Sequence, residues 1–209
     1  KIKKMLKNLN QDTKILLLDG TEKTIRQLSE DGGEYWVYAC DESGKIMPGK
    51  AHSARITGHK KLLKITLDNN ESFECTEDHL IMLRDGTYKK AIDLLTTDSL
   101  MPLYRKVGEE DYLKGYELIH QMMPSGKRRW TPTHLIVRDA FNLKVKNSEK
   151  TICHHKDFNK ENNIPENLEM MSWYEHKKAH GEVGRNNFKK IWKNPNHPYT
   201  IYRKSEEYK

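Results

Sequence analysis

The stretch from residue 151 to residue 180 reads "TICHHKDFNKENNIPENLEMMSWYEHKKAH", and it carries much of the information on fold and chemistry. Two adjacent histidines open it, asparagines fill its middle, and two histidines four positions apart close it. The pattern of Ser172 followed by Glu175 is typical of a capping box, so a helix is expected over "SWYEHKKAHGE". A strand that ends in a loop is expected over "KTICHHKDF", followed by the turn-rich segment "NKENNIPEN".

The spacing of these histidines predicts a metal site. His176 and His180 lie four apart, so on a helix both imidazoles share one face. His154 and His155 are adjacent at a strand end and point to opposite sides, so one of them can join the helical pair while the other stays beside the site. Neutral imidazole is a common ligand of transition metals. The alternative is that these are unrelated histidines of the surface.

The segment "CHHKDFNKENNIPENLEMMSWYEHKKAH" resembles the HNH motif of the ββα-metal nucleases, over about residues 115–182. Its double histidine is similar to that of phage homing endonucleases and colicin nucleases. The resemblance implies that His155 is the general base and that His154 is a metal ligand on the same strand. It also implies that Asn167, in "PENLE", is the middle asparagine that holds the loop.

The same resemblance implies the remaining parts of the metal site. His176 is the closing ligand, His180 an additional one, and Asp157 a weaker candidate. Mg²⁺ is the expected metal by analogy with homing enzymes, whereas the softness of the ligands leaves Mn²⁺, Zn²⁺ or Ni²⁺ open. The implied reaction is hydrolysis of a DNA phosphodiester to 3′-hydroxyl and 5′-phosphate ends. The target sequence, and whether one strand or both are cut, stay open.

Charge is distributed unevenly along the chain. Residues 1–104 hold 16 Lys and Arg against 16 Asp and Glu, whereas residues 105–209 hold 21 against 14, which accounts for the whole net charge of +7. This asymmetry predicts that the second half meets a polyanion, with a solvated surface as the alternative. The HNH resemblance implies that this partner is double-stranded DNA. The candidate DNA-binding residues are Lys127, Arg128, Arg129, Trp130, Lys177, Lys178, Arg185, Lys189 and Lys190.

Residues 12–104 read as short strands and hairpins, with short helical candidates near Arg26–Glu30 and Ala91–Leu95. The segments "DTKILLLDG", "ECTEDHLIML" and "DSLMPLY" resemble the N-terminal part of an intein, or Hint domain. The resemblance implies that Thr76 and His79 polarise the peptide bond before the first intein residue. The alternative is a threonine at a strand end beside a buried, hydrogen-bonded histidine.

Two departures from the intein pattern affect splicing. The usual position of the nucleophile falls near Asn8, and residues 1–12 contain no Cys or Ser. The C-terminal signature, His-Asn before a Cys, Ser or Thr, is also absent. The host protein that an intein interrupts is therefore an expected partner only if the chain is an intein or was derived from one.

The remaining features bear on the cellular location. Three widely separated cysteines form no Cys-x-x-Cys pair and are expected to be reduced thiols. The sequence has no apolar stretch that could span a membrane and no secretory signal pattern, so a cytoplasmic protein with no membrane partner is expected.

The sequence thus predicts an α+β multidomain protein. A mostly-β Hint-type domain (1–104) and a linker (105–114) are followed by a small ββα-metal HNH domain (115–184) and a basic helical tail (185–209). The expected function is that of an intein-encoded, metal-dependent homing endonuclease. Its rivals are a working protein-splicing domain and a non-catalytic DNA-binding module that is stabilised by zinc.

Overall fold

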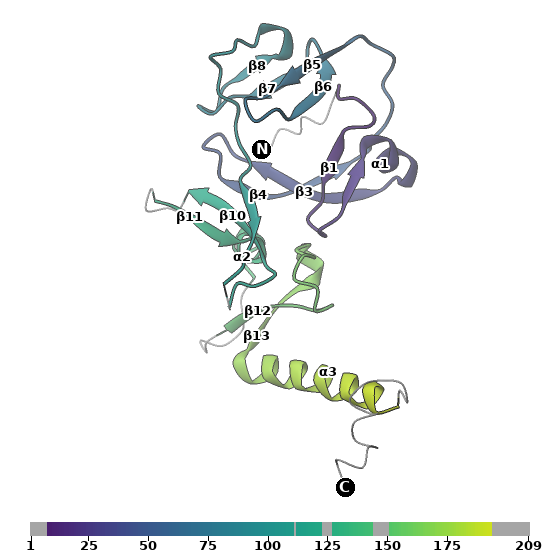
Figure 1. Cartoon of the computed structure of the whole chain (residues 1–209), viewed down its shortest axis with the longest axis vertical. Helices are drawn as coiled ribbons and strands as arrows, with labels where there is room; N and C mark the ends of the chain where they lie inside the picture. The colour runs from purple at the N-terminus through teal and green to yellow at the C-terminus, as the bar shows by residue number, and fades with distance from the viewer. Residues whose placement is uncertain (1–7, 111, 123–126, 144–150, 194–209) are drawn as a thin grey trace, which may run out of the picture. The chain divides into compact units, whose positions relative to one another are not determined.

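The computed structural model describes residues 8–110, 112–122, 127–143 and 151–193 (Figure 1). The chain forms two compact units. The first consists of Lys1–Leu143 and His155–Leu168, and the second of Lys144–His154 and Glu169–Lys209. Among the described residues, no helix is long and apolar enough to cross a membrane.

The first unit begins with antiparallel strand pairs whose strands follow one another in the sequence, as the hairpin signals predict. The pairs are β1 (Lys14–Leu16) with β2 (Glu22–Thr24), β3 (Glu34–Cys40) with β4 (Ile46–His52), β5 (Leu62–Thr66) with β6 (Ser72–Thr76), and β7 (Leu80–Met82) with β8 (Tyr88–Lys90).

Aspartates and glycines make the turns between these strands. Asp85 accepts a hydrogen bond from the backbone N–H of Thr87 at 2.9 Å, and Gly86 between them has a φ of 88°. An added Cβ at Gly86 would lie 2.3 Å from the carbonyl oxygen of Glu42, so the close approach of that backbone also requires glycine. Asp41 makes the corresponding turn between β3 and β4.

Three short helices accompany the strands of the first unit. Thr24 caps α1 (Ile25–Asp31), and its side chain and that of Gln27 form a capping box. The 3₁₀ helix η1 (Ala91–Asp93) follows β8, and α2 (Thr133–Ala140) follows the strand β11 (Arg128–Pro132). The first two lie where short helical segments were predicted.

The segment expected to be a linker contains a strand. β9 (Arg105–Val107), β10 (Glu117–Met122) and β11 (Arg128–Pro132) form a three-stranded antiparallel sheet with β10 at its centre. The charged sequence "RKV" did not predict a strand. The strand forms because it pairs with β10, and not because of its own composition.

A shared core joins this sheet to the strands before it. Ile46, Ile119 and Ile136 pack together from β4, β10 and α2. Beside them the carboxylate of Glu117 accepts hydrogen bonds from the Tyr38 hydroxyl and from Thr133 (2.7 Å). Residues on both sides of the expected boundary at 104 therefore belong to one unit, which differs from the predicted division into domains.

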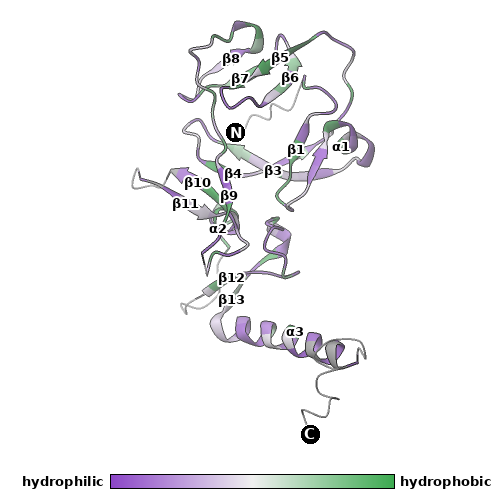
Figure 2. Cartoon of the chain, viewed as in Figure 1, coloured by the Kyte–Doolittle hydropathy of each residue, from purple (hydrophilic) through white to green (hydrophobic). Residues whose placement is uncertain are grey.

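The second unit is built around β12, β13 and the long helix α3. β12 (Thr151–His155) pairs with β13 (Leu168–Ser172), and the short 3₁₀ helix η2 (Pro165–Asn167), which belongs to the first unit, precedes β13 in the sequence. α3 (Trp173–Lys193) is mostly hydrophilic (Figure 2). The strand β12, the loop after it and the helix α3 follow the predicted order, whereas the strand β13 was not predicted from the sequence. The HNH and Hint assignments stay predictions.

The predicted capping box at the start of α3 is confirmed. The Ser172 hydroxyl accepts from the Glu175 backbone N–H at 3.2 Å, and the Glu175 carboxylate accepts from the Ser172 backbone N–H at 2.8 Å. The helix runs beyond the expected end of the nuclease domain at residue 184 and includes 185–193 of the expected tail. Residues 194–209 of that tail lie outside the described residues.

Candidate metal centre and catalytic loop

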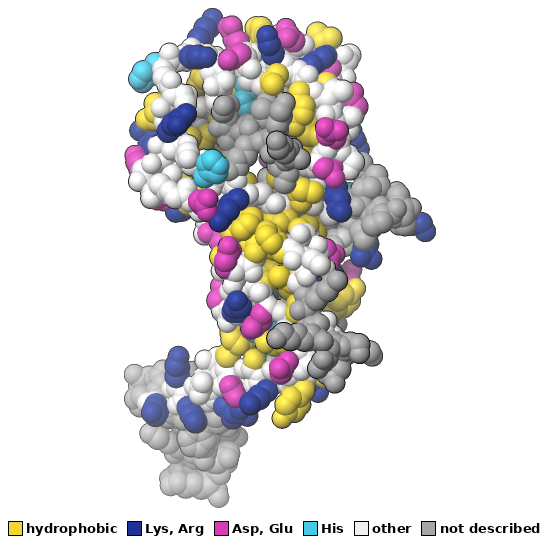
Figure 3. Space-filling model, turned by 180° about the vertical axis from the view of Figure 1, so that it is seen from behind, with side chains coloured by type: hydrophobic (Ala, Val, Ile, Leu, Met, Phe, Trp, Pro, Cys, Tyr) yellow, Lys and Arg dark blue, Asp and Glu magenta, His cyan; other side chains and the backbone are white. Residues whose placement is uncertain are grey.

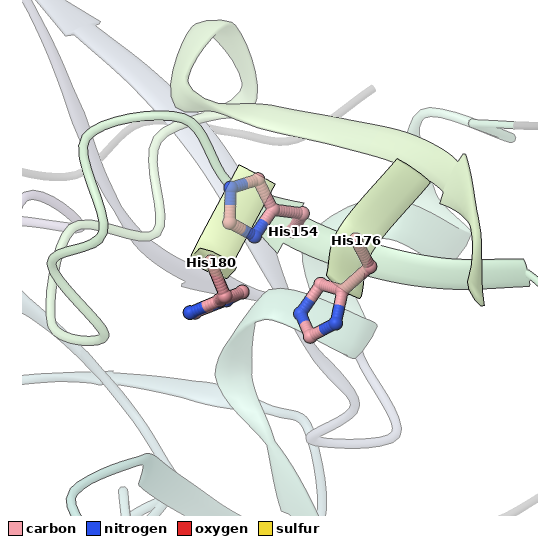
Figure 4. Close-up of side chains that lie close together, drawn as sticks. All are labelled: His154, His176 and His180. Atoms are coloured by element: carbon pink, nitrogen blue, oxygen red, sulfur yellow. The ribbon is translucent and has the colours of Figure 1, made fainter. Parts of the chain in front are cut away.

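Three of the histidines singled out in the sequence come together in the second unit. His154 extends from β12, and His176 and His180 extend from one face of α3 (Figure 4). One ring nitrogen of each lies within 4.8 Å of the others. The ring centroids are 5.3 Å apart for His154 and His176, 5.3 Å for His154 and His180, and 4.4 Å for His176 and His180. The expected i, i+4 face and the strand histidine therefore converge.

The donor set of this histidine cluster fits a transition metal. His154 is buried, His176 is half-buried and His180 is exposed, so the cluster is closed on one side and open on the other. Burial and the neighbouring His180 lower the pKa of His176, which favours the neutral imidazole that a metal requires. Three imidazole nitrogens suit Zn²⁺ or Ni²⁺ better than Mg²⁺ or Mn²⁺, which prefer oxygen ligands.

His155 lies in the first unit and is only 4% exposed. Its Nε2 is 3.1 Å from Oδ1 of Asn163, and Nδ2 of Asn163 donates to the carbonyl oxygen of Glu161 at 3.0 Å. Because the amide nitrogen is committed to Glu161, Oδ1 faces the imidazole, and Nε2 of His155 must donate. In the neutral ring the lone pair then lies on Nδ1, which is the atom that could accept a proton.

Two aromatic side chains pack against His155. Its ring centroid lies 5.1 Å from that of His134 and 5.9 Å from that of Tyr116. Burial lowers the pKa of His155, and burial together with the nearby His155 lowers the pKa of His134 to about 3. Both imidazoles are therefore held neutral at physiological pH. Neither His134 nor Tyr116 was identified from the sequence, because a lone histidine in a helix and a lone tyrosine carry no motif.

Asn167 ties together the loop that follows His155. Its Nδ2 donates to the Asp157 carboxylate at 2.9 Å and to the carbonyl oxygen of Asn162 at 2.8 Å, and its Oδ1 accepts from the Asp157 N–H at 3.2 Å. Burial raises the pKa of Asp157, but hydrogen bonds from Asn167, Asn159 and Asn162 outweigh it and hold the pKa below its usual range. Asp157 therefore stabilises the loop through its hydrogen bonds with Asn167. The asparagine that contacts His155 is Asn163.

The same loop is fastened to the strands at the start of the chain. The Asn163 N–H donates to the carbonyl oxygen of Leu18 at 2.6 Å, and Trp36 Nε1 donates to the Glu166 carboxylate at 2.7 Å. Gly20 lies so close to Glu161 that an added Cβ would come within 2.8 Å of the Glu161 Cβ. The β-rich part of the first unit therefore fixes the position of the loop that carries His155.

The second candidate site lies at the end of β6. Thr76 and His79 are both buried, and the Thr76 hydroxyl donates to the Asp78 carboxylate. The Thr76 N–H donates to the carbonyl oxygen of Asn8 at 2.9 Å, and Asn8 has a φ of 70°. The structure thus brings Asn8 to Thr76, and the intein register stays a prediction. Residues 1–7 lie outside the described part of the chain.

The predicted DNA-binding residues fall on two elements. The "GKRRW" segment leads into β11, where Lys127 and Arg129 are exposed and Trp130 is 39% exposed, while the Arg128 side chain lies outside the described atoms. On α3 the exposed cations follow the helix, as Figure 3 shows. They include the predicted residues Lys177, Lys178, Arg185, Lys189 and Lys190.

Comparison with known proteins gives partial matches. No protein-family model matches the chain. It is 40% identical over 181 residues to the B subunit of DNA gyrase from Synechocystis sp. (strain ATCC 27184 / PCC 6803 / Kazusa), covering 81% of this chain and 16% of that protein. It is also 36% identical over 101 residues to DNA-directed RNA polymerase III subunit rpc2 of Dictyostelium discoideum, covering 44% of this chain and 6% of that protein. The chain therefore spans less than a fifth of the length of either relative.

Proposed function

We propose that this chain is a metal-dependent DNA endonuclease of the HNH type, attached to a Hint-type domain. The observation that carries the proposal is the pairing of two features on consecutive residues. His154 belongs to a cluster of three imidazoles, and His155 is a buried neutral imidazole held by Asn163. Consecutive Cα atoms are about 3.8 Å apart, so the backbone positions of the proposed base and of the proposed ligand are adjacent.

In this proposal each residue has one task. A divalent cation held by His154, His176 and His180 would neutralise charge on the scissile phosphate and on the departing 3′ oxygen. His155 accepts a proton at Nδ1 from the attacking water, because Asn163 occupies Nε2. Asn167 keeps the loop in shape through the Asp157 backbone and carboxylate. The cations of α3 bind the DNA backbone.

The comparisons support the proposal that this chain is an element inserted into host proteins. The chain matches short fractions, 16% and 6%, of two proteins that have different names and come from different organisms. A segment that several host proteins carry is what an intein with a homing nuclease would produce. The longer match covers 81% of this chain, so it includes residues of both the Hint-like and the nuclease-like parts. The host protein would then be a partner of this chain.

A plasmid-cleavage assay tests the nuclease activity. The full chain is incubated with supercoiled plasmid and Mn²⁺, Zn²⁺, Ni²⁺ or Mg²⁺ in separate reactions, with EDTA as the control. The proposal expects nicked or linear DNA with a transition metal and none with EDTA. His155→Ala, which leaves all three proposed ligands in place, excludes a contaminating nuclease. No cleavage with any metal would contradict the proposal.

Two further candidates have specific support. A splicing or autoprocessing role is favoured by the hydrogen bond between Thr76 and Asn8, although Asn8 lacks a nucleophilic side chain. A DNA-binding module with a structural zinc is favoured by the histidine cluster itself. In that case removal of the metal would unfold the second unit, and no metal would produce cleavage.

A further inference from the structure

A row of aromatic rings crosses the three-stranded sheet of the first unit. His120 and Trp130 are direct partners in the pairing of β10 with β11. The His120 N–H donates to the carbonyl oxygen of Tyr104 at 3.0 Å, which extends the pairing of β9 with β10 by one residue. Directly opposed residues share one face of a sheet. Tyr104, His120 and Trp130 therefore form a line across three neighbouring segments, which we call the aromatic row.

The rings of the aromatic row contact one another and remain accessible. The ring centroid of His120 lies 6.3 Å from that of Tyr104 and 5.1 Å from that of Trp130. Tyr104 is 47% exposed and Trp130 is 39% exposed. The opposite face of β10 carries the fully buried Ile119, which belongs to the core. On the face of the aromatic row Leu118 is also buried, while Tyr104 and Trp130 are exposed and His120 is half-buried, so the row is partly accessible to solvent.

A cation accompanies the aromatic row. Lys106 Nζ lies 4.8 Å from the Trp130 ring centroid, and Lys106 pairs with Leu118, two residues from His120 on the same face. Within the part of the chain that the structure describes, Lys106 forms no ion pair with a carboxylate. Its charge is thus available to an anion that approaches the rings.

Exposed rings with a neighbouring cation fit one class of partner best. Aromatic side chains stack on bases, and lysine binds the phosphates between them. In an intact duplex the faces of the bases are covered by their neighbours, whereas a single strand presents them. We propose that the aromatic row and Lys106 bind single-stranded DNA, as a surface separate from the histidine cluster. This proposal deepens the proposed nuclease function, because it makes the sheet the binding surface for an unpaired DNA strand.

Binding of a short fluorescein-labelled oligothymidylate to the full chain tests this proposal. The measurement is anisotropy in EDTA, so it requires no metal and no cleavage. Stacking of a base is worth about 1–3 kcal/mol, so Trp130→Ala is expected to weaken binding by about fivefold to a hundredfold. Trp130→Phe, which keeps a ring, is expected to retain most of the affinity. Tyr112→Ala, at a tyrosine that is 77% exposed and outside the sheet, is the matched control.

The outcomes separate this proposal from the nuclease. Unchanged affinity of Trp130→Ala for the oligothymidylate would overturn it, as would an equal loss of affinity for an intact duplex of the same length. Failure of the parent chain to bind the oligothymidylate would also overturn it. None of these results bears on plasmid cleavage, and a chain that fails to cut can still bind a single strand. Circular dichroism melting of each variant checks that the sheet is folded.

Discussion

Asn163 accepts a hydrogen bond from Nε2 of His155 at 3.1 Å, and its own amide nitrogen is held by the Glu161 carbonyl at 3.0 Å. This relationship fixes the tautomer of His155 and leaves Nδ1 as its basic atom. Asn163 is 1% exposed, and its backbone N–H is bonded to Leu18. The asparagine is therefore itself held in place, which makes it a positioning residue for the proposed base.

His155→Ala is expected to reduce cleavage by about 10²–10⁴-fold, because general-base catalysis contributes that much. Asn163→Ala is expected to reduce the cleavage rate by about two- to tenfold, because that factor corresponds to the free energy of one hydrogen bond. Asn163→Asp, which keeps an acceptor oxygen, is expected to recover part of this loss. Single-turnover cleavage as a function of pH measures all three, and an unimpaired His155→Ala would contradict the role of His155 as base.

The histidine cluster predicts that His176→Ala weakens metal binding by at least about tenfold. The variant loses one of three convergent imidazoles, so its cleavage is expected to recover partly in excess metal. Titration calorimetry with Zn²⁺ and Mn²⁺ measures the affinity. Tyr174→Ala is the control, since Tyr174 is 76% exposed on the same helix and is no ligand. Equal metal affinity in His176→Ala and the parent would remove His176 from the site.

Binding to duplex DNA is expected to weaken steeply with salt. Each phosphate contact releases about 0.9 counterion on duplex DNA, so losing contacts flattens the slope of log affinity against log salt. Charge reversal at Arg128, Arg129, Lys189 and Lys190 is expected to flatten that slope. Fluorescence anisotropy across a series of salt concentrations measures it.

A matched set of reversals controls for the change in net charge. It consists of four exposed cations of the β-rich part: Lys61, Lys64, Arg84 and Lys90. These reversals are expected to leave the slope nearly unchanged. If the two sets had the same effect, the DNA surface would lie elsewhere.

The low pKa of His134 predicts that the folded chain loses stability in acid. Its pKa falls from 6.5 in the unfolded chain to about 3 in the folded one, mainly because it is buried. Between these values the unfolded chain binds a proton that the folded chain does not, so stability falls as the pH falls from 6.5 toward 3. Between pH 7 and pH 5 this amounts to about 2 kcal/mol. Urea unfolding of His134→Phe at both pH values is expected to show a pH dependence smaller by about that amount, whereas the same dependence as the parent would contradict the assignment.

Local signals were sufficient to predict much of the structure. The capping box depends on Ser172 and Glu175, and the shared helix face on His176 and His180, so in both cases the residues lie within four positions of each other. Those parts of the prediction agree with the structure because helix periodicity and helix capping act over that range.

Contacts between distant segments could not be read in the same way. β9 forms only because β10 offers it a partner, so its charged sequence resembled a linker. The contact of Asn163 with His155 depends on the path of the loop, which Leu18 and Trp36 help to fix from far away in the sequence. The position of His134 beside His155 depends on the packing of α2 and carries no sequence pattern.

The contact between Asn8 and Thr76 predicts that the parent chain does not cleave itself. The first step of splicing requires a side chain that attacks the preceding carbonyl carbon, and the Asn8 carboxamide is a poor nucleophile because its nitrogen lone pair is delocalised. In Asn8→Cys, the thiol attacks the carbonyl carbon of residue 7, the bond to the residue 8 nitrogen breaks, and that nitrogen leaves as an amine. Dithiothreitol then exchanges with the thioester and releases residues 1–7.

Intact-mass measurement after incubation with dithiothreitol tests this sequence of steps. Loss of residues 1–7 is expected in Asn8→Cys and not in the parent, and the double variant Asn8→Cys with His79→Ala is expected to lose them more slowly. Cleavage of the parent would show that another residue is the nucleophile. If neither chain were cleaved, Thr76 and His79 would serve only the structure at the end of β6, and the Hint-like strands would act as the support that holds the His155 loop through Leu18 and Trp36.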